Sequence, residues 1–464
     1  MFQIKEVLSP SVKEALAMTV LIVAIISVSL IKFQAVPHMP ILFAILLLIC
    51  YGLIKGVPYY KLEKGLVAGA GAGMSAVFLF FFIGILISSW MMSGTIPTLI
   101  YAGFNLVTPL FFFAIVFVVT SIIGLSIGSS LTTVATVGVA FIGMASVMDI
   151  SLAITAGAIV SGAFFGDKMS PLSDTTNLAS SMVGVDLFEH IRNMGWTTVP
   201  AFIISLIVFA VLSPDSSMAQ LDDVAIFQQG LLDTGAIHWY SMIPLLVLII
   251  LTIGKVPALM TLAVSSIVAV AISFFHFSYS AAEVLAILYS GFVSETGVKD
   301  IDQLLSRGGM ESMLFTVGLV LLALSMGGLL FTLGIVQCLL GKLESVLKKV
   351  SSVIAASALT AIGINVLIGE QYLSILLTGQ AFHTQYEKVG LTGKNLSRVM
   401  EDAGTVVNPL VPWSVCGIFI TSVLGVSTLT YLPFAFFCLL SPILTVLFGY
   451  TGKTLTYRKA EKLQ

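Results

Sequence analysis

The stretch from Gly162 to Asn177 combines chemically active side chains with a position that breaks a helix. It holds the charged residues Asp167, Lys168 and Asp174 and the hydroxyl and amide residues Ser173, Thr175, Thr176 and Asn177. Pro171 lies among them, and apolar runs lie on both sides. An ionised side chain in hydrocarbon costs at least ~2.5 kcal/mol, so such a segment is expected only around a protein-lined cavity. This stretch is therefore the first candidate for a functional site.

The residue types in this stretch suit a cation and a proton. Na⁺ is a hard cation, and Asp174, Thr175 and Asn177 offer carboxylate, hydroxyl and amide oxygens on a segment that we expect to be unwound. A carboxyl group in a poorly hydrated site holds a proton more readily than one in water, so a cation and a proton can compete for it. We take Asp174 as the first shared carboxylate. The alternative is that Asp167 pairs with Lys168 or with a neighbouring charge only to neutralise it, while the hydroxyls cap helix ends.

Three further polar stretches interrupt apolar runs and supply the remaining candidate ligands. They are Glu370 and Gln371 after Gly369, then Asp402, Thr405 and Asn408 within residues 401–413, and Ser129 and Ser130 within residues 124–133. We expect Asp402 and Asn408 to join the Na⁺ shell, and we rank Asp167, Glu370 and Asp402 behind Asp174 as carboxylates. The alternatives are a structural ion pair at Glu370, an interfacial loop anchored by Trp413, and serines that bond to their own helix.

The elements that position these residues must lie in a membrane. Of the 464 residues 58% are hydrophobic and only 9% are charged, and the mean hydropathy is +1.08. A chain with so little polar surface cannot coat a water-soluble globule, so lipid is its expected partner. Because a membrane helix needs ~20 apolar residues, the runs predict an all-α polytopic protein with about ten to thirteen membrane segments. The glycine series Gly65, Gly69 and Gly73 predicts a closely packed helix face.

Charge in the loops predicts the orientation and the division of the chain. Short basic loops, such as those holding Lys55, Lys61 and Arg192, should face the cytoplasm together with both termini, while residues 213–238 contain four aspartates and no Lys or Arg and suit the outer face. We divide the chain into N-terminal spans (1–65), a first repeat (66–213), an external acidic loop with linking spans (214–310), a second repeat (311–449) and a cytoplasmic tail (450–464).

The two repeats are predicted from the order of their features. Gly73-Met74, the broken segment from Gly124 to Ser130 and the polar cluster from Asp174 to Asn177 are followed later in the chain by a similar series. That series is Gly309-Met310, the segment from Gly363 to Glu370 and the cluster from Asp402 to Asn408. Duplicated halves are the usual way for a transporter to form two access states around one site.

The motif from Gly166 to Asn177, preceded by Gly94-Thr95-Ile96-Pro97, closely resembles the NhaC family of bacterial sodium/proton antiporters. The resemblance covers essentially the whole chain. It implies two inverted repeats, each with a re-entrant hairpin and a broken helix, whose polar tips at Asp174–Asn177 and Asp402–Asn408 meet at the membrane midplane. It also implies relatives that carry malate and lactate or amino acids, and relatives that form homodimers.

These observations predict a secondary transporter of the bacterial inner membrane that exchanges Na⁺ for H⁺ by alternating access. The runner-up is a Na⁺- and H⁺-coupled antiporter of small organic acids, such as malate and lactate, or of an amino acid, with Lys168 as the cation that binds a carboxylate. We expect no cofactor, no nucleic-acid partner and no enzymatic activity. The alternatives from other classes are an ion channel and an intramembrane hydrolase. A long chain with two dissimilar polar halves suits a single-site carrier better than a channel. No spacing of Ser, His or Asp requires a hydrolase.

Overall fold

The computed structural model describes residues 6–106, 110–214, 221–343 and 349–458. Every regular element in these ranges is helical, and the only bridge between extended segments joins Leu391 to Tyr457. The all-α class is therefore confirmed. Residues 215–220 of the expected external loop and 459–464 of the expected tail lie outside the described residues.

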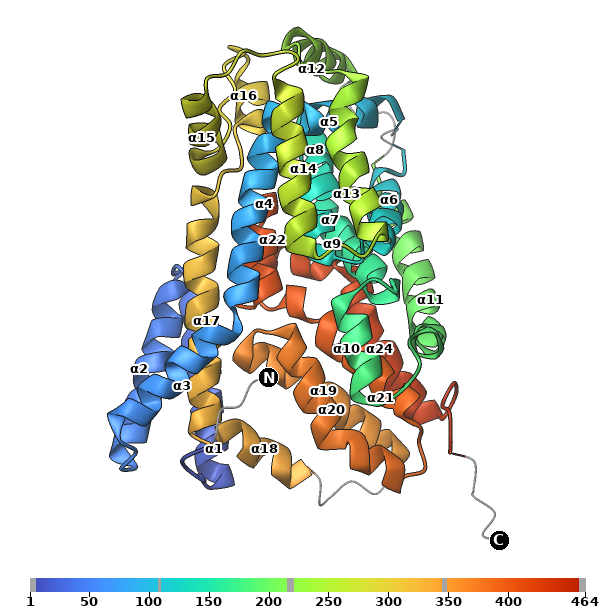
Figure 1. The fold of residues 1–464 in the computed structure, drawn as a ribbon. Coiled ribbons are helices and arrows are strands. Elements are labelled where there is room, and N and C mark those ends of the chain that lie inside the picture. The colour runs from blue at the N-terminus through green and yellow to red at the C-terminus, as the bar shows by residue number, and fades with distance from the viewer. Residues whose placement is uncertain (1–5, 107–109, 215–220, 344–348, 459–464) are drawn as a thin grey trace.

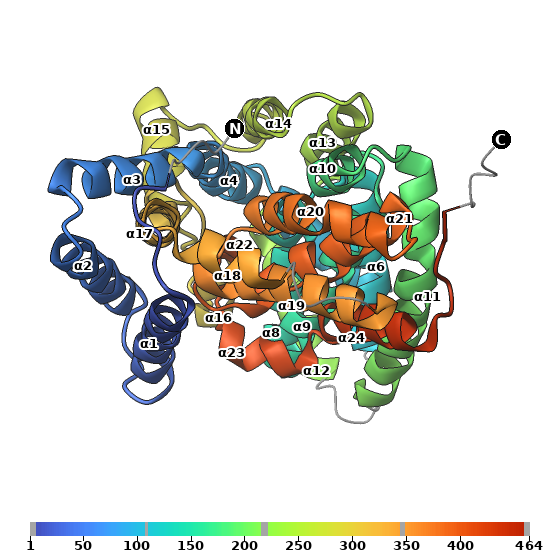
Figure 2. The same cartoon turned by 90° about the horizontal axis from the view of Figure 1, so that it is seen from below.

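The first helices stand to one side of the molecule (Figure 2). They are α1 (Val12–Ile31), α2 (His38–Ile54) and α3 (Tyr59–Ala72). A capping box between Ser11 and Glu14 starts α1 by pairing backbone N–H groups that would otherwise lack acceptors. Helix α3 packs against α17 (Leu314–Thr332).

The first repeat contains a hairpin and a broken helix that both reach only the middle of the bundle. Its helices are α4 (Met74–Met92), α5 (Thr95–Leu106), α6 (Phe112–Ile127), α7 (Ser130–Thr133), η1 (Val134–Gly138), α8 (Val139–Val147), α9 (Leu152–Met169), α10 (Asp174–Met182) and α11 (Leu187–Leu212). Helix α6 descends from the upper end in Figure 1, and α7, η1 and α8 return to that end. Gly128 permits this reversal because its φ of 69° lies in the left-handed region that a side chain disfavours.

The second repeat has the same plan but enters from the opposite end. Its helices are α17, α18 (Ile335–Leu343), α19 (Val350–Ile368), α20 (Gln371–Lys388), α21 (Gly393–Val399), η4 (Met400–Thr405), η5 (Asn408–Leu410), α22 (Val415–Leu424), α23 (Thr428–Tyr431), η6 (Leu432–Phe434) and α24 (Phe436–Thr451). Hairpin α19–α20 rises from the lower end and turns at Gly369, whose φ is 76°. The two hairpins thus point toward each other, and the inverted arrangement is confirmed.

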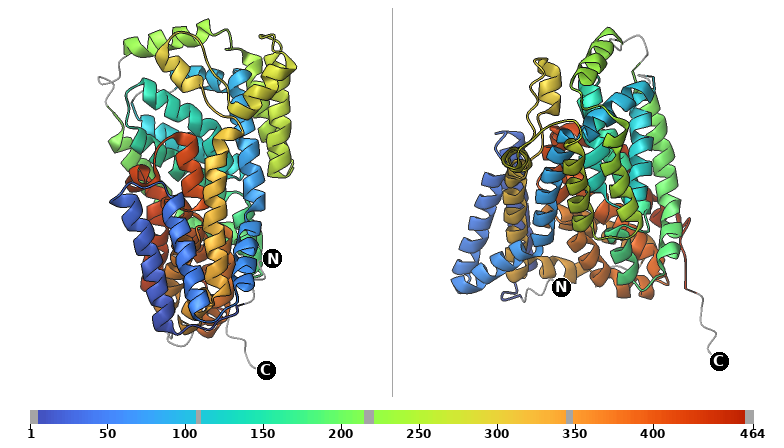
Figure 3. Two further views of the ribbon diagram at one scale, coloured as in Figure 1. Left: turned by 90° about the vertical axis from the view of Figure 1, so that its left-hand side faces the viewer. Right: turned by 45° about the horizontal axis from the view of Figure 1, so that its top comes forward.

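Linking helices cover the upper end between the repeats (Figure 3). They are α12 (Leu221–Asp233), η2 (Trp239–Met242), α13 (Ile243–Ile253), α14 (Ala258–Ser273), α15 (Ala281–Ser290), α16 (Lys299–Leu305) and η3 (Glu311–Met313). Seven described helical segments are long and apolar enough to cross a membrane, or nine if two bent pairs each form a span. Six shorter apolar helices, including α6 of the first hairpin, add to these. The prediction of ten to thirteen membrane segments included such shorter apolar helices together with the full-length spans.

Candidate functional site

The site lies where the two hairpins and the two broken helices meet in the middle of the bundle. In the first broken helix, α9 ends at Met169 and α10 begins at Asp174. Pro171 has no backbone N–H and cannot continue α9, while Ser173 caps the start of α10 by accepting the N–H of Thr176. Thr176 in turn donates its hydroxyl to the carbonyl of Lys168 at 3.0 Å. Side chains of the motif therefore form hydrogen bonds with backbone groups that the helix break would otherwise leave without partners.

Asp167 joins the first broken helix to the tip of the first hairpin. Its carboxylate accepts a hydrogen bond of 2.8 Å from Ser130, and only 5% of the side chain is exposed. Ser129 caps α7, which places Ser130 at the turn where it can reach Asp167. Asp167 also interacts electrostatically with Asp174 across the break. A carboxylate beside a hairpin tip and a second acid is an arrangement that can accept a cation or a proton.

Lys168 joins the two broken helices to each other. It donates a hydrogen bond to Oδ1 of Asp402 on η4, and neither side chain is exposed. The other carboxylate oxygen, Oδ2, accepts the hydroxyl of Thr445 on α24 at 2.7 Å. The alternative in which Lys168 neutralises its neighbour Asp167 is therefore wrong. Adjacent residues of one helix point about 100° apart, and this turns Lys168 toward Asp402 while Asp167 faces Ser130.

Glu401 is a buried carboxyl group beside Thr405, and it forms no ion pair in the described part of the chain. Both of its oxygens lack a hydrogen bond, as does the hydroxyl of Thr405 one turn later. Glu401 interacts electrostatically with Asp167, Lys168 and Asp402. Residues 400–405 form a π-helical segment, a rare geometry that is frequent at functional sites. Because an unpaired buried carboxylate is very costly, Glu401 is best accommodated as the neutral acid in this conformation.

Amide groups hold the second hairpin against the second broken helix. Asn365 donates to the carbonyl of Gly404 at 2.6 Å, and Asn408 donates to Oδ1 of Asn365 at 2.8 Å. Asn408 also accepts the backbone N–H of Cys416 at 3.0 Å. Trp413 is buried and donates to the carbonyl of Val366, so its interpretation as a headgroup anchor is wrong. In this conformation the Asn408 amide is engaged in fixing the break.

The tip of the second hairpin carries the next predicted carboxylate. Glu370 caps α20 by accepting the backbone N–H of Leu373 at 2.7 Å, and its side chain is half-buried. No ion pair involves Glu370 within the described ranges, so the structural-ion-pair alternative is not supported. Gln371 is buried beside the thiol of Cys416.

Two predicted ligands of the first repeat differ from what a buried cation shell requires. Asp174 is the first residue of α10 and is exposed, and Asn177 is exposed and donates to the carbonyls of Pro171 and Ser173. The expectation of a buried Asp174 is wrong here, because this residue lies on the exposed side of the first turn of α10, whereas Thr176 in the same turn is buried. Thr175 is buried and bonds to Ser173. Packing of α10 against η4 brings the two polar tips together, as expected.

Sequence reasoning missed two members of this network. Thr445 stands alone in an apolar run, and no local pattern indicates that it faces Asp402. Asn365 lies in a segment recognised as interrupted, and a lone amide in such a segment is the signal that could have identified it. Among the described residues, the acidic, His and Cys side chains form no cluster of three that could hold a metal ion.

Comparisons with known proteins agree with this arrangement. The sequence model described as the Na⁺/H⁺ antiporter family matches residues 162–453, which include the breaks of both broken helices. The chain is 41% identical over 92% of its length to the Na⁺/H⁺ antiporter NhaC of Alkalihalophilus pseudofirmus, covering 93% of that protein, and 36% identical over 95% of its length to NhaC of Bacillus subtilis, covering 98%. It is 34% identical to the malate-2H⁺/Na⁺-lactate antiporter of Bacillus subtilis, over 89% of this chain and 90% of that protein.

Proposed function

This chain belongs to the Na⁺/H⁺ antiporter family, its resemblance to the NhaC family is confirmed, and we propose that it exchanges Na⁺ for H⁺ across a bacterial inner membrane by alternating access. The observation that carries the proposal is the buried pair of Lys168 and Asp402, with the unpaired acid Glu401 beside Asp402. A cation, a carboxylate and a neutral acid at one mid-bundle position are the groups needed to trade a proton for a metal cation.

We assign the cation to carboxylates of both broken helices. Asp174 remains the first ligand because its exposed oxygens have no hydrogen bond within the described ranges and lie close to Asp167. Thr175 and Asn177 would complete this part of the shell. Asp402 joins when Lys168 moves away from it, and Asn408 joins only if its bond to Asn365 opens. The bound Na⁺ would therefore take the place of the Lys168 ammonium, which pairs with Asp402 in this conformation.

We assign the proton to Glu401. Its two oxygens can hold one proton without disturbing another bond, and its neighbour Asp402 is one of the acids that we assign to the cation. Loading a cation at Asp402 would free the ammonium of Lys168, which would then favour ionisation of Glu401. Proton release and cation binding would thus be coupled through one lysine.

Opposed hairpins support alternating access. Hairpin α6–α8 closes the site from the upper end and α19–α20 closes it from the lower end (Figure 1). Tilting one repeat against the other would open one side at a time. We propose that the lower end is cytoplasmic, because Lys55, Lys61 and Lys64 lie near it while the acidic segment around α12 lies at the other end.

The second candidate is an organic-acid antiporter, which the similarity to the malate-2H⁺/Na⁺-lactate antiporter favours. Such a carrier needs a cationic or amide group facing its substrate. Lys168 was the expected group, but Asp402 accepts its hydrogen bond and both side chains are buried. Exchange of Na⁺ for H⁺ without an organic solute is therefore the better supported function.

A proteoliposome assay tests the proposal. Wild type and Asp174→Asn are reconstituted with an internal pH dye, and sodium chloride, malate or lactate is added outside. We expect a saturable, sodium-dependent pH change that needs no organic solute and is lost in Asp174→Asn. A response that requires malate or lactate would overturn the first function and support the second. Asp233→Asn, on α12 far from the site, is the matched control and should behave as wild type.

A further inference from the structure

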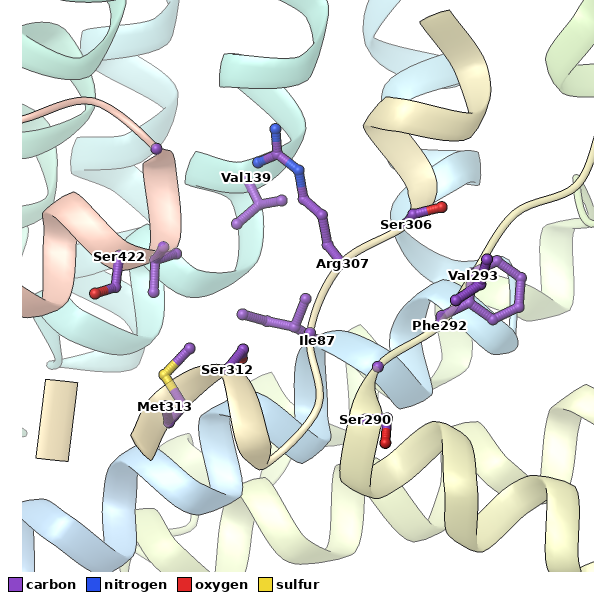
Figure 4. A pocket seen from close by; sticks show the side chains of 14 residues that line it. Ile87, Val139, Ser290, Phe292, Val293, Ser306, Arg307, Ser312, Met313 and Ser422 are labelled. Carbon is purple, nitrogen blue, oxygen red and sulfur yellow. The ribbon is translucent and has the colours of Figure 1, made fainter. Parts of the chain in front are cut away.

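A second polar feature lies apart from the mid-bundle site, in a cavity of about 360 Å³ near the upper end (Figure 4). The ends of α8, α15 and α22 line it, together with η3 and with Ile87 of α4. Its walls are largely apolar and include Ile87, Val139, Phe292, Val293 and Met313. Arg307 is the charged residue among the lining residues, and its side chain extends between these walls.

The Arg307 guanidinium has no hydrogen bond or ion pair with any described residue. Burial lowers the pKa of Arg307, and no neighbouring carboxylate offsets this effect. The acids nearest along the chain are Glu311, which is exposed, and Asp302, whose oxygens accept hydrogen bonds from Ser294, Thr296 and Gly297 instead. A partly buried guanidinium that lacks an acceptor in the described protein can bind an anion that reaches it.

The backbone holds Arg307 in place. Its carbonyl accepts the N–H of Phe292 at 3.2 Å, and two residues later Gly309 donates to the carbonyl of Gly84 on α4 at 2.8 Å. Gly308 has a φ of 90°, and a Cβ there would lie 2.4 Å from the backbone nitrogen of Ser88. The loop is therefore pressed against α4, and its conformation directs the guanidinium into the cavity. Such a fixed donor is typical of a binding site.

We propose that this cavity binds a small monocarboxylate through Arg307. A guanidinium is a fork of N–H donors that matches the two oxygens of a carboxylate. The apolar wall residues suit a short aliphatic tail, and the lining also contains four serines: Ser290, Ser306, Ser312 and Ser422. The cavity volume lies within the range of small-molecule sites, although near its lower limit.

An anion bound in this cavity would contact both repeats. Val139 is the first residue of α8, the outer arm of the first hairpin, and Ser422 lies near the end of α22, the outer half of the second broken helix. An anion held there would bridge elements that also form the cation site. This inference does not depend on the proposed exchange, because it concerns binding at a different place and can be measured without transport.

Titration calorimetry on the purified full-length protein tests the proposal. Sodium lactate, sodium acetate and sodium chloride are titrated separately into the protein at a constant sodium concentration set with a bulky zwitterionic buffer. We expect saturable lactate or acetate binding that weakens by about tenfold or more in Arg307→Gln, since a charge-assisted hydrogen bond is lost. Arg192→Gln removes an exposed arginine from α11 and should bind as wild type.

Arg307→Lys keeps the charge and removes the fork, and it guards against a general folding defect of Arg307→Gln. It should weaken carboxylate binding severalfold while it elutes as a monodisperse protein. Chloride binding without carboxylate binding would show an inorganic anion site and overturn the carboxylate assignment. Equal carboxylate binding in wild type and both Arg307 variants, or none in wild type, would overturn the site itself.

Discussion

Lys168 in the first broken helix donates a hydrogen bond to Asp402 in the second, and both side chains are fully buried. This contact links residues that lie far apart in the sequence and belong to repeats of opposite orientation. Asp402 receives its second bond from Thr445, so its two oxygens are both occupied. A cation can reach Asp402 only if Lys168 and Asp402 separate. We therefore infer that this conformation, in which they are paired, is closed to the cation.

Asp402→Asn should destabilise the protein by roughly 3–5 kcal/mol, because it leaves the Lys168 ammonium buried without a counter-charge. Replacing both residues with apolar ones, as Lys168→Met with Asp402→Leu, should cost less than the sum of the single changes. Unfolding of the purified variants in detergent measures both effects. The matched control is the exposed pair of Glu189 and Lys394, where Glu189→Gln should change stability by less than about 1 kcal/mol. A loss at Asp402 no larger than at Glu189 would contradict the assignment.

Glu401→Gln should abolish sodium-dependent proton flux while the protein stays folded. The amide has nearly the shape of the neutral acid, and no described hydrogen bond is lost, so the unfolding temperature should change little. Flux in proteoliposomes and thermal unfolding are measured on the same preparation. Glu387→Gln alters an exposed glutamate that pairs with Arg458 and should retain wild-type flux. Normal flux in Glu401→Gln would exclude Glu401 as the proton carrier.

The sequence predicted the fold well because membrane solvation limits the choices. Apolar runs of sufficient length must be helices, and interruptions such as Gly128 and Pro171 must lie where protein surrounds them. The order of these features also predicted the inverted repeats. It did not predict which short helices form hairpin arms, since α6 and α13 have similar composition and only packing distinguishes them.

The sequence predicted which segments form the site, but it did not predict which side chains contact each other. Asp167, Lys168, Asp402 and Ser130 were named, and the structure brings them together. Their pairing was not predictable, because a residue type does not indicate where its side chain points. The partner of Lys168 also comes from the other repeat. Asp174 was placed in a buried shell, whereas its position in the first turn of α10 exposes it.

Gly69→Ala should lower stability by about 1–3 kcal/mol, because a Cβ there would lie 2.2 Å from the carbonyl oxygen of Leu324 on α17. This approach confirms the predicted packing face of α3. Gly71→Ala, two residues later, is the matched control, since a Cβ there meets nothing within 4 Å. It should leave stability unchanged or raise it by up to about 1 kcal/mol. Thermal unfolding of the two variants checks the difference, and equal effects would contradict the close contact.

Asp302→Asn should destabilise the upper loop in a pH-dependent way. Hydrogen bonds from the backbone N–H of Thr296, and then from its hydroxyl and from Ser294 and Gly297, hold the pKa of Asp302 below its usual value. Because the folded pKa is lower than the unfolded value of about 4, the stabilisation is complete above about pH 4 and is lost as the pH falls through the folded pKa. The difference in unfolding temperature between wild type and Asp302→Asn should therefore be present near neutral pH and shrink in acid. Glu295→Gln alters an exposed neighbour and is the matched control. A difference for Asp302→Asn that persists in acid would show that shape rather than charge holds the loop.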